Sequence, residues 1–340
     1  MKIKLILGII ISVGFLTWAF WDVNLSEFSN ALASAHYVYF IIAMTIGMVI
    51  FAIRAFRWKY LLILQKDIPF PTVFSATCIG FFTNNVLPFR AGELLRAYVI
   101  GKRAEISATA ALATIVVERI LDVFTLILIA VSIIFFLPIP ESSHFQAIKY
   151  FGAILILVES LVIVFCFMLL VWRQITIRLV DVLLTIFPER IHTRGKTIVN
   201  SFINGLEIMR SARYFLLLFF LSFAIWFMVL LQIFTVMRAF DIQMEYFTMF
   251  TAGLADLVLI SFALTIPSAP GFVGTFHAAA KEGLLIFSVD PVTAVGFSVL
   301  FHAASYIPIT IVGFFYFMRE NIRFSTAIPH KRDAIAKEEP

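Results

Sequence analysis

A polar stretch that interrupts an otherwise apolar chain decides the fold: Asn84-Asn85-Val86-Leu87-Pro88-Phe89-Arg90-Ala91-Gly92-Glu93-Leu94-Leu95-Arg96. Pro88 lacks an N–H group and restricts its neighbours, so a preceding helix must end near it. Gly92 permits a tight restart. Arg90, Glu93 and Arg96 follow at intervals of three, which places them on one face of the new helix. Charges beside a broken helix in a membrane protein normally line an internal cavity, so we expect the functional site here.

The composition indicates an all-α polytopic membrane protein. Of the 340 residues, 61% are hydrophobic and only 14% are charged, whereas soluble domains have about 25% charged residues. The formal net charge of +5 comes from basic residues in the loops between apolar segments. This is the positive-inside pattern, so we predict an integral protein of the cytoplasmic (inner) membrane with no nucleic acid partner.

Apolar runs and flanking charges predict about six spanning helices, with both termini in the cytoplasm. Arg54 and Arg57, for example, place the end of the second span on that side. Residues 1–320 would form one membrane domain, followed by a cytoplasmic tail at 321–340. Residues 172–213 have apolar positions at helical spacing, so we expect amphipathic helices on the cytoplasmic surface. The predicted spans are residues 3–21, 37–64, 106–137, 147–171, 214–238 and 291–318.

Two further segments are apolar but broken, and they predict re-entrant hairpins. The first, broken at Pro88, has basic residues at both ends and would enter from the cytoplasm. The second stops at Pro267-Ser268-Ala269-Pro270-Gly271 and would enter from outside. Residues 37–137 and residues 214–318 would each contain a spanning helix, a re-entrant hairpin and a second spanning helix, in that order. This pattern is typical of an inverted repeat with a substrate site at the midplane.

Two charged clusters are candidates for that site. Arg90 and Arg96 carry planar guanidinium groups that suit phosphate oxygens, and a new helix N-terminus at Gly92 would offer N–H groups to an anion. Glu93 would hold an arginine or act as a counter-charge; alternatively, these residues only pin the hairpin to the next span. Glu118, Arg119 and Asp122 lie on that span, where they are either fixed structural pairs or switching partners of the arginines.

The second break adds further candidates. Pro270, Gly271 and Gly274 lie in a loop whose exposed backbone groups would let a ligand approach closely. Asp256, in the apolar arm before that loop, is a candidate functional charge. His277 could titrate or could be a hydrogen-bonded structural residue. Asn85, in the first break, is a further candidate for the binding site. Glu159 lies in the fourth span, and we expect it to form a hydrogen bond between helices.

The chain shows no Gly-rich phosphate loop, no nucleophile elbow and no His/Cys metal cluster, so the sequence predicts neither a cofactor nor a metal. Three motifs together resemble the membrane region of lysylphosphatidylglycerol synthases and related flippase-like proteins. The motifs are Asn85–Arg96, Glu118-Arg119-Ile120-Leu121-Asp122, and Pro270-Gly271-Phe272-Val273-Gly274-Thr275-Phe276-His277. Many relatives have Glu where this chain has His277. The resemblance implies movement of charged or glycosylated lipids, without the soluble transferase domain of the bifunctional synthases.

The leading hypothesis is therefore a flippase or scramblase for an anionic phospholipid or a polyprenyl-phosphate-linked lipid. The alternative is a membrane subunit or enzyme of lipid or glycolipid modification, with the same residues binding a lipid phosphate beside a partner glycosyl- or aminoacyl-transferase. An ion- or proton-coupled carrier of small solutes is a weaker third hypothesis.

Overall fold

The computed structural model describes residues 2–87, 90–136 and 211–320, together with isolated residues between 153 and 182. The described part contains helices and no strand. Its elements are α1 (Lys2–Phe20), α2 (Leu25–Ser34), α3 (Tyr37–Leu62), α4 (Phe70–Val86), α5 (Ala91–Ala104), α6 (Ala108–Phe136), α10 (Ala212–Ala239), α11 (Tyr246–Ala263), the short 3-10 helix η2 (Pro270–Phe272), α12 (Thr275–Leu285) and α13 (Pro291–Arg319).

The prediction of a polytopic helical membrane protein is confirmed. Four described helices, α3, α10, α11 and α13, are long and apolar enough to cross a membrane. The bent pair of α1 and α2, with an angle of 83° at the break, would make a fifth span if counted as one. Apart from the isolated residues between 153 and 182, three predicted segments lie outside the described residues. They are the span at 147–171 with Glu159, the amphipathic segment 172–213 as far as residue 210, and the tail at 321–340.

Both predicted breaks are present. In the first half, α4 ends at Val86 and α5 begins at Ala91 after Arg90, which has a left-handed backbone with φ of 51°. In the second half, α11 ends at Ala263 and the chain reaches α12 through η2. Gly271 and Gly274 have φ of 71° and 93° in this loop, a conformation that favours glycine. Glycine thus permits the second break, while Arg90 adopts the left-handed backbone at the first.

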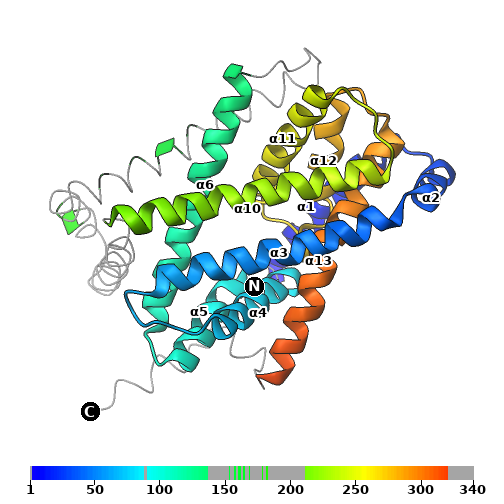
Figure 1. Ribbon diagram of the computed structural model, residues 1–340. Coiled ribbons are helices and arrows are strands. Elements are labelled where there is room, and N and C mark those ends of the chain that lie inside the picture. Colours follow the sequence, from blue (N-terminus) through cyan, green and yellow to red (C-terminus); the bar gives the residue numbers. More distant parts are fainter. Residues whose placement is uncertain are drawn as a thin grey trace.

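The helices of the two halves make matched contacts. Helices α3 and α10 pack side by side along their length, and each half has its own hairpin, α4–α5 in the first and α11–α12 in the second. Helix α6 of the first half contacts α10 and α11 of the second. In the same way, α13 of the second half contacts α3 and α4 of the first. In Figure 1 the hairpins lie on opposite sides of the α3–α10 pair. The repeat over 37–137 and 214–318 stays a prediction. The opposite orientation of the halves in the membrane stays a prediction.

Two hydrophobic cores follow this division. One joins α4, α5 and parts of α3 and α6, around the fully buried Trp58 and Ile79. The other joins α10–α13 with parts of α3 and α6, around Ile233 and Phe297. The first core also takes in Leu218 of α10 and Phe317 of α13, so the two halves pack into each other.

Helix α2 lies between the first two predicted spans, where the sequence analysis predicted no helix. Its Asn24 caps the helix, since the Ser26 N–H donates to Asn24 Oδ1 at 2.9 Å, and Asn is a preferred capping residue. Helix α1 packs against α12 and the loop before it. There the Ala269 N–H donates to Ser12 Oγ at 2.7 Å, and Gly274 lies directly against the Ser12 backbone.

Candidate functional site

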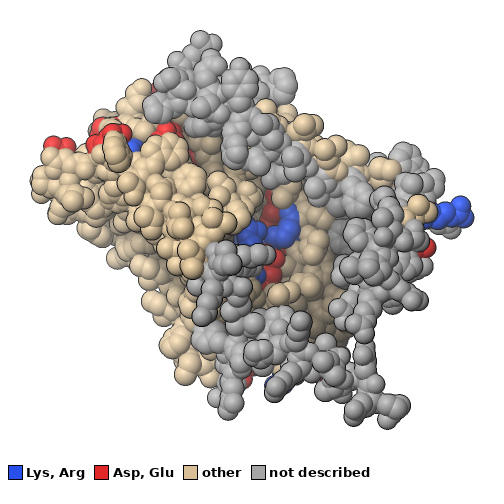
Figure 2. Space-filling view, turned by 180° about the vertical axis from the view of Figure 1, so that it is seen from behind, with Lys and Arg blue, Asp and Glu red and all other residues tan. Residues whose placement is uncertain are grey.

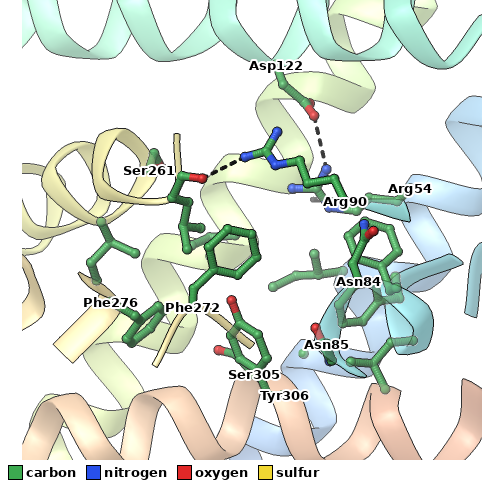
Figure 3. Close-up of a pocket in the computed structure, with 18 of the residues that line it drawn as sticks. Arg54, Asn84, Asn85, Arg90, Asp122, Ser261, Phe272, Phe276, Ser305 and Tyr306 are labelled. Atoms are coloured by element: carbon green, nitrogen blue, oxygen red, sulfur yellow. Dashed lines mark hydrogen bonds and ion pairs between the residues drawn. The ribbon is translucent and has the colours of Figure 1, made fainter. Parts of the chain in front are cut away.

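A cavity of about 280 Å³ lies where the two halves meet, and its wall comes from α3, α4, α5, α6, α10, α11, η2, α12 and α13. Figure 3 shows side chains of both halves converging on it. Its charged and polar lining consists of Arg54, Asn84, Asn85, Arg90, Glu93, Arg96, Arg119, Asp122, Gln232, Ser261, Thr265, Ser305 and Tyr306. Its aromatic lining consists of Phe51, Phe81, Trp226, Phe272, Phe276 and Phe301.

Arg90 reaches across this cavity from the first break to the second half. Its Nη2 donates to the carbonyl oxygen of Leu264 at 2.8 Å, and Leu264 is the C-cap of α11 (Figure 3). The guanidinium also lies 5.8 Å from the centre of the Phe272 ring. The C-terminal carbonyls of a helix favour a cation. Within the described part of the chain Arg90 has no carboxylate partner, unlike every other arginine of the cavity.

The neighbouring asparagines hold the first break closed. Asn84 Oδ1 accepts the Gly92 N–H at 2.8 Å, and Gly92 packs so closely on Gly80 of α4 that a Cβ there would clash with its backbone. Asn85 Nδ2 donates to Thr310 Oγ1 of α13 at 2.8 Å. The Gly92 N–H is therefore not available to an anion, which corrects that part of the expectation for the start of α5.

Arg96, Glu118 and Asp122 belong to a buried ion-pair network. Glu118 Oε2 lies 3.1 Å from Arg96 Nη2, and Glu118 Oε1 lies 3.6 Å from Arg57 Nη2 and 3.2 Å from Arg119 Nη2. The Arg96 guanidinium also stacks on Trp58, 3.7 Å from the ring centre. The structure thus uses Arg96 as an anchor between α3, α5 and α6.

Asp122 is the second centre of the network. Its carboxylate lies 2.7 Å from Arg57 Nη2, 3.1 Å from Arg54 Nη1 and 3.3 Å from Arg119 Nη1. Glu93 completes the set, with Oε1 at 3.6 Å from Arg119 Nε. Seen from behind, basic and acidic side chains gather in a recess near the centre of an otherwise largely uncharged described surface (Figure 2).

The network and the cavity carry more positive than negative charge. Five arginines (Arg54, Arg57, Arg90, Arg96 and Arg119) face three carboxylates (Glu93, Glu118 and Asp122), a formal excess of two positive charges in the described part of the chain. An excess of cations in a site of low dielectric attracts an anion strongly.

Arg54 and Arg57 were missed as site residues, and the cytoplasmic orientation of the helix end for which they served as markers stays a prediction. Arg57 is fully buried and Arg54 is only 9% exposed. Arg57 also donates to Ser222 Oγ of α10 at 2.8 Å. Their position well inside the apolar run of α3 was the available signal, because charges within a span normally face the protein interior.

The far wall of the cavity is uncharged, and sequence reasoning missed it as well. Gln232 of α10 donates from Nε2 to the Ala43 carbonyl oxygen at 2.8 Å. Trp226 lines the cavity and is 9% exposed, and its indole N–H has no hydrogen-bond partner in the described part of the structure. In the sequence these residues look like ordinary members of an apolar helix. Only the packing of α10 against α3 shows that they line the cavity.

The remaining predicted residues lie outside the cavity lining. Asp256 is fully buried between α11 and α12, against Gly283, and its oxygens have no hydrogen-bond partner among the described residues. His277 Nδ1 accepts the Gly274 N–H at 3.4 Å, which fits the structural role considered for it. The Gly271 carbonyl bonds to His302 Nε2 at 2.8 Å. Pro270 begins η2, and within residues 267–274 the cavity lining includes Phe272 alone.

Comparison with known proteins places the chain in a family. The model of the lysylphosphatidylglycerol synthase TM region matches residues 5–313, and the chain belongs to this family. It is 25% identical over 301 residues to a UPF0104 membrane protein of Methanothermobacter thermautotrophicus, covering 84% of this chain and 85% of that protein. A UPF0104 membrane protein of Methanocaldococcus jannaschii is 33% identical over 128 residues, 36% of this chain and 38% of that one.

Proposed function

We propose that this protein moves lipids with an anionic head group across the cytoplasmic membrane, as a flippase or scramblase. The lipid phosphate would bind in the cavity at Arg90, while the acyl chains stay in the bilayer. The observation that carries the proposal is the placement of Arg90, whose guanidinium faces the cavity and has, among the described residues, a backbone carbonyl and an aromatic face as its partners.

The partners of Arg90 support exchange with a phosphate. A neutral carbonyl is a weaker acceptor than a phosphate oxygen, and charge-assisted hydrogen bonds are roughly twice as strong as neutral ones. A phosphate can therefore displace the Leu264 carbonyl from the guanidinium. The same event would release the first break from the end of α11, because Arg90 bridges the two.

The size and position of the cavity support a head group as the cargo. A volume of about 280 Å³ is near the lower end of ligand pockets, about 300–1,000 Å³, and is too small for two acyl chains. In transporters built from repeats, the substrate site lies between the halves at the broken helices. The cavity lies at that place, and the positive-inside pattern would put both termini in the cytoplasm.

Reconstitution tests this proposal. Liposomes containing a fluorescent anionic phospholipid would be treated with dithionite, which quenches only the outer leaflet. The wild-type protein should move inner-leaflet lipid outward. Arg90→Ala removes a charge-assisted hydrogen bond worth about 1.5–3 kcal/mol and should slow movement about ten- to a hundredfold.

The matched control is Arg238→Ala, which removes an exposed arginine at the end of α10 and should leave the rate unchanged. Equal rates for Arg90→Ala and wild type would refute the site. No movement of any lipid by folded wild-type protein would refute the transport function and favour a membrane subunit of a lipid-modifying system.

A further inference from the structure

Helix α11 carries a carboxyl group that the fold buries without a partner. Asp256 is 0% exposed, and neither of its oxygens has a hydrogen-bond partner among the described residues. Helix α12 packs against it, and Gly283 of that helix lies so close that a Cβ there would clash with Asp256 Oδ1 and with the Asp256 backbone. Where a methyl group does not fit, a water molecule does not fit either. The contact between the two helices therefore keeps Asp256 dry on this side.

No neighbouring charge compensates an ionised Asp256. Among the described helices, α6, α10 and α12 pack against α11. On α12, Lys281 is two positions from Gly283 and so points to another side of the helix, where its Nζ lies 3.9 Å from Asp22 Oδ2. The other titratable groups of these helices are Tyr246 on α11, His277 and Glu282 on α12, Arg213, Tyr214 and Arg238 on α10, and Glu118, Arg119 and Asp122 on α6. No charged side chain in the described part of the chain acts on Asp256 electrostatically.

The Asp256 carboxyl therefore holds a proton in this structure. An ionised carboxylate without a partner in an apolar interior is so costly that the group takes up a proton instead. The neutral acid still leaves an O–H group without an acceptor, which is a smaller cost. An apolar side chain at this position would carry neither cost, so the stability of the fold does not account for a carboxyl here. Ionisable groups within spanning helices normally mark ion or proton pathways.

Helix α11 links Asp256 to the cavity. The next residue, Leu257, lines the cavity, and the helix is capped by Leu264, whose carbonyl accepts the Arg90 hydrogen bond. When a phosphate displaces that carbonyl, α11 loses its bond to the first break and becomes free to shift against α12. Because the fit at Gly283 is so close, a shift of α11 away from α12 would admit water to the carboxyl.

We infer that Asp256 is a proton-binding site that couples lipid movement to a proton. In the closed α11–α12 hairpin the carboxyl is protonated. When lipid binding opens the hairpin, the O–H bond would break and a water molecule would accept the proton; closure would restore a proton from water. Lipid enters at one face of the membrane and leaves at the other, and the proton would likewise be released and regained at opposite faces. This inference rests on the proposed transport function and adds its energy source.

A pH difference across the liposome membrane tests the coupling. Proteoliposomes with acyl-labelled phosphatidylglycerol would be held at one external pH, with the internal pH either equal or about one unit lower, and the leaflet distribution measured by dithionite quenching. One proton per lipid limits the shift in the ratio of the leaflets to about tenfold per pH unit. We expect the wild type to shift this ratio at least about twofold beyond protein-free liposomes, and a protonophore to abolish the shift.

Asp256→Asn removes the ionisable group and keeps the shape of the neutral acid. In variant protein that still exchanges phosphatidylglycerol at equal pH, the pH difference should no longer shift the distribution. The matched control Asp67→Asn removes a carboxylate whose side chain is 74% exposed and should respond as the wild type does. A wild type that moves lipid without responding to the pH difference, or an Asp256→Asn protein that responds fully, would overturn the coupling and leave the transport function intact. Absence of movement by the wild type would overturn the transport function itself.

A second measurement does not depend on transport. The infrared spectrum of the purified wild type should show the C=O stretching band of a protonated carboxyl, which Asp256→Asn should lack and added phosphatidylglycerol should weaken. Because Asn resembles the neutral acid in shape, the variant should unfold in detergent at the same temperature as the wild type. Absence of the band, or a strong loss of stability in Asp256→Asn, would overturn the protonated site. A band that phosphatidylglycerol leaves unchanged would overturn the coupling.

Discussion

The Nη2 atom of Arg90 donates to the carbonyl oxygen of Leu264 at 2.8 Å, and this bond joins the two breaks of the molecule. Arg90 precedes α5 in the first half, and Leu264 ends α11 in the second. The guanidinium is exposed to the cavity and has no carboxylate partner among the described residues, whereas Arg96 is buried in the ion-pair network. The structure thus distinguishes an arginine that faces the cavity from one that is ion-paired, although both come from the same short motif.

The substitution Arg90→Lys tests whether the planar guanidinium matters or only its charge. Lysine keeps the positive charge but cannot bind a phosphate through two parallel N–H bonds. We expect a rate of anionic lipid movement between those of the wild type and Arg90→Ala, measured by dithionite quenching. If Arg90→Lys is as slow as Arg90→Ala, the planar fork of the guanidinium, and not its charge, accounts for the interaction with the phosphate. If Arg90→Lys is as fast as the wild type, the positive charge alone accounts for it.

Asp122→Asn should destabilise the fold strongly. The carboxylate lies within 3.3 Å of nitrogen atoms of three arginines, and removing one partner of a buried ion pair costs about 3–5 kcal/mol. Thermal unfolding in detergent should show a clear loss of stability. The control Asp67→Asn removes an exposed carboxylate 3.2 Å from Lys59 Nζ, where a surface pair is worth about 0–1 kcal/mol. Similar melting temperatures for the two variants would contradict a central role of Asp122.

The helices and breaks were predictable because their signals are local. Pro88 and the Pro267–Gly271 run mark both interruptions, and the apolar runs between them are long enough to be read as spans. The candidate arginines of the first motif do line the cavity. A short helix such as α2 was missed because its ten residues are mostly polar or small and give no hydropathy signal.

The assignment of individual charges was less predictable, since it depends on which distant helix packs alongside. The position of Arg57 inside an apolar run indicates burial, but only its contacts with α6 and α10 show that its partners are Asp122 and Ser222. Trp226 is one of many aromatic residues in α10, and its cavity position follows from packing between the halves. Interactions across such sequence distances leave no periodic signal in a single chain.

Gly274→Ala should loosen the contact between α1 and the second break. Gly274 has φ of 93°, which an alanine adopts only under strain, and a Cβ there would clash with the Ser12 backbone. We expect a loss of about 1 kcal/mol or more in stability, measured as a lower melting temperature in detergent. Gly14→Ala in α1 is the control, because a Cβ at Gly14 meets no atom within 4 Å. An equal effect of both substitutions would contradict close packing at Gly274.

The most direct test of the central claim is to find where a lipid head group binds. A phosphatidylglycerol analogue with a diazirine on its head group would be photolysed with the protein in liposomes, and the adducts mapped by mass spectrometry. We predict adducts on cavity residues such as Trp226, Phe272 and Tyr306, reduced by Arg90→Ala and by excess unlabelled phosphatidylglycerol. Adducts confined to exposed residues of the outer helix faces, such as Phe220 and Phe314, would contradict the account.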